Sequence, residues 1–298
     1  MMAKKGTFYV GRVLKLGLLN QEMLINAILN PKPIKIRETA WTIIDPQEHN
    51  LGPNKFYTGK LTKYAPKGEV TIIDEEKRRE VLQAEPNLGL ASSHFIYIPE
   101  HSGIAFLNIY NHIDQKTFTN LFSKVIEETY EGFFVRCEIE LISDLKSFAA
   151  KLSGLEKIHQ IKAKISPPNP LFGPLWAPLK DYLISRNTDR MSISEEAPEK
   201  QSILTDIQNI VQQAAEQKEE ELYFTDKPIP IGDAAILMAA DGYGNGEVKG
   251  SQGDELIVIK TSETAKNFTF EKNPDALELY YKLLPILEEI QKNRHMRH

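Results

Sequence analysis

Cysteine is almost absent from this chain of 298 residues, which contains only Cys137. A single thiol cannot form a disulfide within the chain, and it cannot supply the several cysteines of a structural zinc site. Cys137 lies in a run where apolar and polar residues alternate, and it belongs to the apolar set, which predicts a buried core thiol. The sequence therefore excludes a disulfide-stabilised protein and a cysteine-rich zinc protein.

Long apolar runs are missing as well. Arg12 and Lys15 interrupt the apolar residues near the N-terminus, and a membrane-spanning helix requires about 20 consecutive apolar residues. The first residues also do not resemble a secretory signal peptide. We therefore expect a cytoplasmic protein that is not inserted in a membrane.

Neither sign of charge is in strong excess. The formal net charge is -5, and 41% of the residues are hydrophobic and 26% charged. These fractions are typical of a globular protein with a substantial core. The slight acidity argues against a surface that binds nucleic acid all over, but it leaves room for a local basic patch.

Motifs of enzymes and cofactor-binding proteins are incomplete. The glycine-rich run 242–246 lacks a following Gly-Lys-Ser/Thr or helix, so it predicts a hairpin turn and no phosphate-binding loop. Ser143 and Lys146 have the Ser-x-x-Lys spacing without its partner motifs, and a serine at a helix start is ordinarily a cap. We predict no catalytic residue, no cofactor and no metal site, and we favour a non-enzymatic protein.

The clearest structural pattern runs from Phe95 to Leu141. Two β-rich runs joined by the turn residues 99–103 predict a β-hairpin whose second strand is covered on both faces. Asp114 is placed to cap a helix with apolar residues at helical spacing over 118–126. Alternation over 133–141 predicts a further strand, so the unit is expected to be β-β-α-β.

The remaining segments predict an α+β fold, with a largely antiparallel mixed sheet and packed helices. Prolines at 167, 168 and 170 end a strand abruptly and indicate a change of subdomain. We expect two subdomains, 1–152 and 153–298, the second with a long terminal helix. Further strands are predicted at 7–16, 34–44, 56–61, 70–73, 158–165 and 256–260, and further helices at 20–29, 145–152, 175–183, 203–214 and 274–292.

Four basic residues form the candidate binding site. Lys162 and Lys164 lie two apart on the polar face of the strand 158–165, and Arg186 and Arg190 flank a polar loop after the next helix. Basic side chains that converge follow a phosphate backbone and give salt-sensitive binding. Ordinary solubilising charge is the alternative interpretation. We predict that these four residues bind nucleic acid.

Two local strings carry a resemblance to a known group. Residues 104–106 lead into a helix, and the strand 158–165 is closed by Pro168 and Pro170. In these strings and in the order of its elements the chain resembles the RexA-like phage-exclusion proteins and related uncharacterised bacterial and prophage proteins. The resemblance implies a cytoplasmic sensor or effector of anti-phage defence that is often dimeric and binds DNA. It carries no functional residue across, and the acidity of this chain departs from DNA binding.

Two functional hypotheses follow. The first is a non-enzymatic cytoplasmic interaction protein, an anti-phage defence component that binds nucleic acid through the local basic surface. The second is a protein-binding or scaffolding subunit, in which the helices 203–214 and 274–292 form the surface of a homo- or hetero-oligomer. An enzyme such as a nuclease has least support, because the carboxylates show no spacing that would gather metal ions.

Overall fold

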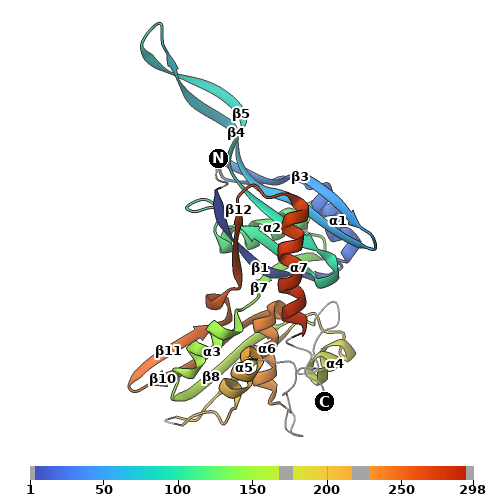
Figure 1. The fold of residues 1–298 in the computed structure, drawn as a ribbon, viewed down its shortest axis with the longest axis vertical. Coiled ribbons are helices and arrows are strands. Elements are labelled where there is room, and N and C mark those ends of the chain that lie inside the picture. Colours follow the sequence, from blue (N-terminus) through green and yellow to red (C-terminus); the bar gives the residue numbers. More distant parts are fainter. Residues whose placement is uncertain (1–3, 168–176, 200, 217–228, 293–298) are drawn as a thin grey trace.

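Figure 1 shows the fold in a computed structural model, which describes residues 4–167, 177–199, 201–216 and 229–292. The described residues form two antiparallel sheets with packed helices, as expected for the α+β class. Within these ranges no helix combines the length and the apolar character that crossing a membrane requires.

The first sheet is covered on both faces. In β5, Phe95 and Tyr97 point to one face and Ile96 and Ile98 to the other, and all four are buried. Helices α1 and α2 pack on the first face and α7 on the second. The strand order is β12-β1-β6-β5-β4-β3-β2, with β7 also paired to β1. The bounds are β1 (Lys5–Gly17), α1 (Gln21–Leu29), β2 (Ile34–Ile36), β3 (Thr39–Leu51), β4 (Asn54–Asp74), β5 (Arg79–Ile98), β6 (Gly103–Leu107), α2 (Gln115–Thr129), β7 (Val135–Leu141), β12 (Asn267–Glu271) and α7 (Ala276–Lys292).

The β-β-α-β unit expected between residues 95 and 141 is confirmed. Strands β5 and β6 pair antiparallel with Phe95 opposite Phe106. The carboxylate of Asp114 accepts the backbone N–H of Thr117 at 2.7 Å and caps α2. Phe118 of α2 then stacks on Phe106 with ring centroids 4.0 Å apart, which fixes the helix on the sheet. Strand β7 closes the unit by pairing with β1.

Within the described residues, helices cover only one face of the second sheet. Its strand order is β11-β10-β8-β9, and its apolar side packs on α3, α5 and α6. Of the described residues, none of the helices lies on the other side, where exposed residues alternate with the buried ones along β8 and β9. The bounds are α3 (Leu145–Ser153), β8 (Lys157–Ile165), α4 (Ala177–Ser185), β9 (Met191–Glu196), α5 (Ile207–Glu216), α6 (Ile231–Met238), β10 (Gly244–Gln252) and β11 (Glu255–Lys260).

The packing does not follow the expected boundary at residue 152. Helix α3, placed in the first subdomain by the sequence, packs on α5 in the core of the second sheet. Strand β12 pairs with β1, and α7 packs on the first sheet, so the chain returns to its first core at the C-terminal end. Composition and periodicity mark strands and helices, but they do not show which sheet an element joins.

One long strand replaces the two that were expected at 56–61 and 70–73. Strand β4 runs through Pro66 and Gly68 without a turn, and it pairs with β5 as far as Asp74 opposite Arg79. Strand β3 pairs with β4 only up to Tyr64, and proline is tolerated where one side of a strand is bare. Residues 65–91 therefore form a two-stranded arm that extends from the body, as Figure 1 shows.

Two local predictions are wrong. The polar segment 187–200, in which the sequence predicted no strand, contains β9, whose short pattern alternates but consists mostly of polar residues. The glycine-rich run 242–246 is not a hairpin turn, because its first residues end a π-helical turn after α6 and the rest begin β10. Gly242 has a positive φ of 81°, which accounts for a glycine at this buried position.

Candidate functional site

The open face of the second sheet presents Lys162 and Lys164 to solvent. Both lie on β8, where they alternate with the buried residues Ile161, Ala163 and Ile165. The three apolar side chains pack into the core beneath the sheet, so period-two alternation places the lysines on the outer side. The structure confirms that these two predicted site residues share one exposed face.

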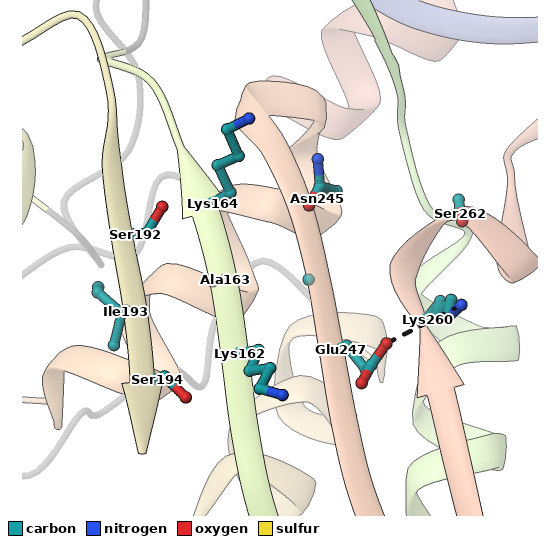
Figure 2. A pocket seen from close by; sticks show the side chains of 11 residues that line it. Lys162, Ala163, Lys164, Ser192, Ile193, Ser194, Asn245, Glu247, Lys260 and Ser262 are labelled. Carbon is teal, nitrogen blue, oxygen red and sulfur yellow. Dashed lines mark ion pairs between the residues drawn. The ribbon is translucent and has the colours of Figure 1, made fainter.

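Polar residues of the neighbouring strands flank the two lysines. Ser194 of β9 and Glu247 of β10 lie opposite Lys162 in the register, and Ser192 and Asn245 lie opposite Lys164. Figure 2 shows these side chains on the same side of the sheet. They line a shallow hollow of about 510 Å³ that also reaches Lys260 and Ser262.

The charge of this face is positive, although the chain as a whole is acidic. Besides the two lysines of β8 it carries Lys260 of β11 and, by the register of β10, Lys249, against two carboxylates, Glu247 of β10 and Glu196 of β9. Lys260 lies 3.9 Å from the carboxylate of Glu247, so one of these cations is partly neutralised within the face. No Phe, Tyr or Trp occurs in β8, β9, β10 or β11, and both ring nitrogens of His159 in β8 are hydrogen-bonded, to Gln201 and Ser251. The face therefore offers ammonium groups and hydroxyls, but no Phe, Tyr or Trp ring on which a base could stack.

Arg190 is already engaged within the protein. Its guanidinium forms an ion pair with the carboxylate of Glu138 on β7 of the first sheet. Burial raises the pKa of the neighbouring Glu140 above its ordinary value. Three groups partly offset this rise in pKa: Asn245, which donates a hydrogen bond to the Glu140 carboxylate at 3.3 Å, and the positive charges of Arg190 and Lys164. Arg190 thus lies near Lys164, and its ion pair with Glu138 links the two sheets. Because its guanidinium is already paired and its side chain is only 18% exposed, it is poorly placed to bind a ligand.

Arg186 lies away from the open face. It follows the C-terminal end of α4 and donates its backbone N–H to the carbonyl of Tyr182 at 3.0 Å. Leu179 and Leu183 of α4 are buried in the core that lies under the sheet, on the side of α6. The structure therefore brings Lys162 and Lys164 together, places Arg190 at the edge of their face, and leaves Arg186 on the helical side.

A match to a known family includes two of the strands that form this surface, β8 and β9. Residues 21–221 match the family described as Domain of unknown function (DUF4747), and this range is more than half of the 298 residues. The chain belongs to the DUF4747 family. The matched range of DUF4747 includes β8 and β9, and with them Lys162 and Lys164. A search of curated proteins found no match.

The two helices proposed as an oligomer surface bury most of their apolar residues within the chain, although Leu277 and Tyr281 of α7 are exposed. Helix α5 buries Ile207, Ile210 and Val211 against the second sheet, and α7 buries Leu283 and Leu287 against the first. Their hydrophobic stripes therefore serve the two cores. In the described ranges there is also no group of three or more His, Cys, Asp or Glu residues placed to hold a metal ion.

Sequence reasoning missed the residues that β10 and β11 contribute to the face. Asn245, Lys249 and Lys260 lie more than 80 positions after Lys162 and Lys164. Their alternation with buried Gly246, Val248 and Ile259 is the signal that marks them as outward-facing. The pairing of β10 with β8 was not detectable from that pattern.

Proposed function

We propose that this protein is a non-enzymatic cytoplasmic protein that binds the phosphate backbone of nucleic acid on the open face of its second sheet. One observation carries the proposal: Lys162 and Lys164 project side by side from a face that no described helix covers and that also bears Lys249 and Lys260. Ammonium groups that neutralise phosphates release counterions, and this release supplies most of the affinity of non-specific binding.

The chemistry of the face favours backbone contacts over base reading. Phosphate oxygens accept hydrogen bonds from lysine, serine and asparagine, and all three residue types line the hollow. Since the four strands lack Phe, Tyr and Trp and the ring nitrogens of His159 are engaged by Gln201 and Ser251, stacking of unpaired bases is not supported. Affinity is therefore expected to depend strongly on salt and only weakly on sequence.

We further propose that the protein acts in anti-phage defence. This part of the proposal rests only on the resemblance to RexA-like proteins. Lys162 and Lys164 remain the proposed contact residues, and Lys249 and Lys260 are added to them. Arg190 and Arg186 are no longer proposed as direct contacts, because the first is paired with Glu138 and the second lies on the helical side.

A salt titration tests the proposal. Affinity for a single-stranded DNA and for the matching duplex is measured by fluorescence anisotropy over a range of salt concentrations. We expect log affinity to fall linearly with log salt, and Lys162→Glu/Lys164→Glu to make the slope shallower by about 1.4 for single strands and about 1.8 for duplex, given about 0.7 and 0.9 per phosphate contact.

The matched control is Lys35→Glu/Lys116→Glu. These two lysines are also exposed, but they lie on β2 and α2 of the first part of the fold, and the substitutions change the net charge by the same amount. If both double variants lose affinity equally, the effect is one of global charge and the proposed surface is refuted. Absence of binding at low salt would refute nucleic-acid binding altogether and favour a protein partner.

A further inference from the structure

The two-stranded arm of residues 65–91 has two bare edges. Strand β3 leaves β4 at Tyr64, and strand β6 pairs with β5 only from Phe95 onward. Between these points β4 and β5 pair only with each other in the described part of the chain. The arm lies at the end of the molecule opposite the second sheet (Figure 1).

The arm exposes apolar residues that its own two strands cannot bury. The side chains of Ile72, Ile73 and Leu82 are 42%, 69% and 68% exposed. Ile72 shares one face of the arm with Val81, its partner in the register, while Ile73 and Leu82 lie on the opposite face. Two strands alone are marginally stable in water, and a third strand or a packed face is needed for independent stability. The arm is therefore suited to gaining additional strands from a partner.

The two edges differ in their capacity to pair. On β5, Pro86 has no N–H to donate, Asn87 has a positive φ of 58°, and a register shift interrupts the strand near Gly89. These are features that protect a strand edge from further pairing. On β4, Pro66 at the base of the arm likewise has no N–H to donate, but the segment from Lys67 to Asp74 includes four consecutive β-branched residues at 70–73, whereas the facing segment of β5 from Arg79 to Glu85 includes only Val81. The edge of β4 beyond Pro66 is thus the better suited of the two to pair with another strand.

The charges along this edge are self-complementary. When two copies of β4 run antiparallel around Thr71, Val70 of each copy lies opposite Ile72 of the other, and the same register brings Lys67 opposite Glu75, the first residue after β4. Opposite charges and β-branched pairs across strands are each stabilising. A nucleic-acid partner is disfavoured, because residues 65–91 carry six acidic and four basic side chains.

We propose that the free edge of β4 in the arm pairs antiparallel with the same edge of a second copy of this chain. The two arms then form a four-stranded ribbon around a two-fold axis at Thr71. Identical surfaces meet across such an axis, which is the commonest arrangement of homodimers. Because the arm is remote from the second sheet, both lysine-bearing faces stay open in this dimer.

Disulfide crosslinking of the full chain tests the register. Paired residues of neighbouring strands have Cβ atoms about 5 Å apart, close enough for Thr71→Cys to form an intermolecular disulfide with small adjustment. The control is Leu82→Cys, which lies directly opposite Thr71 on β5 and is 68% exposed. Two copies of Leu82 would be about 14 Å apart, three strand spacings, and out of reach. The native Cys137 is buried and does not interfere.

We expect Thr71→Cys to give a covalent dimer under mild oxidation and Leu82→Cys to stay monomeric on a denaturing gel. Sedimentation velocity of the unmodified chain should show a dimer, and replacing residues 68–85 by an Asn-Gly turn should give a monomer with an unchanged circular dichroism spectrum of the body. A monomeric unmodified chain, a dimer that survives this shortening, or equal crosslinking of both cysteine variants overturns the proposal.

Discussion

At Gly244, adding a single methyl group tests how closely β10 and β8 pack in the open face of the second sheet. Gly244 begins β10 opposite Ile165, and its φ of 156° lies in a region that L-residues other than glycine rarely adopt. A Cβ atom built here would lie 2.0 Å from the carbonyl oxygen of Lys164 and 2.9 Å from the Cα of Ile165. Both atoms are backbone, so β10 must move away from β8 to admit an alanine.

The magnitude of Gly244→Ala follows from two costs. Backbone strain contributes about 1 to 3 kcal/mol, and the displacement of a packed strand contributes about another 1 to 3 kcal/mol. We therefore expect the free energy of unfolding to fall by about 2 to 6 kcal/mol. The same displacement separates Asn245 from Lys164, so DNA affinity should fall as well.

Gly253→Ala is the matched control for this prediction. Gly253 also has a positive φ, of 57°, but a Cβ atom there would meet nothing within 4 Å. Only the conformational cost of a left-handed alanine remains, about 1 to 2 kcal/mol. Urea denaturation followed by circular dichroism measures both variants. Equal losses of stability in the two variants, or full DNA affinity in folded Gly244→Ala, would refute the reasoning.

Two further predictions concern the two cores. Burial lowers the pKa of Lys15 to about 8, and the nearby Cys137 partly offsets this effect. In the unfolded chain the pKa of a lysine is about 10.4. Between about pH 8 and about pH 10.4 the unfolded chain therefore binds a proton that the folded chain does not. Stability should therefore rise with pH in this window relative to Lys15→Met, as measured by urea titrations; parallel pH profiles of the two proteins would contradict this. Asp144 accepts the N–H of Ser147 at 3.0 Å at the start of α3 and forms a 3.0 Å ion pair with Lys266. Asp144→Ala should cost about 1 to 2 kcal/mol, and Asp144→Asn, which keeps a capping oxygen, should recover most of it by the same assay; equal losses would show that the ion pair dominates.

Periodicity predicted well the elements whose buried face can be read from the order of apolar and polar residues within a single strand or helix. Alternation over residues 158–165 placed Lys162 and Lys164 outward, and the apolar stripe of 118–126 placed α2 on the sheet. Prediction failed where a partner decided the structure. Strand β9 has few apolar residues, and it is held by its pairing to β8, with Ser192 opposite Lys164.

The cap of α3 shows the same limit at the scale of one turn. The sequence suggested Ser143 as the cap, but the adjacent Asp144 performs that role. Ser143 is buried and donates to the carbonyl oxygen of Thr261 at 2.7 Å, a contact between residues 118 positions apart. Both residues are good caps by chemistry, so only a distant partner could decide between them.

By itself the sequence determined the α+β class, the β-β-α-β unit, the absence of a disulfide framework and the outward position of two lysines. These properties depend on the spacing of apolar residues, on composition and on local helix capping. Spacing and capping are determined by residues that are close together in the sequence. Only the tertiary structure decided that β10 and β11 extend the lysine face, that Arg190 is paired with Glu138, that Arg186 lies on the helical side, and that β4 and β5 continue into a bare arm. These outcomes depend on which strands pair across long chain separations, and pairing is a property of the whole sheet that no local pattern records.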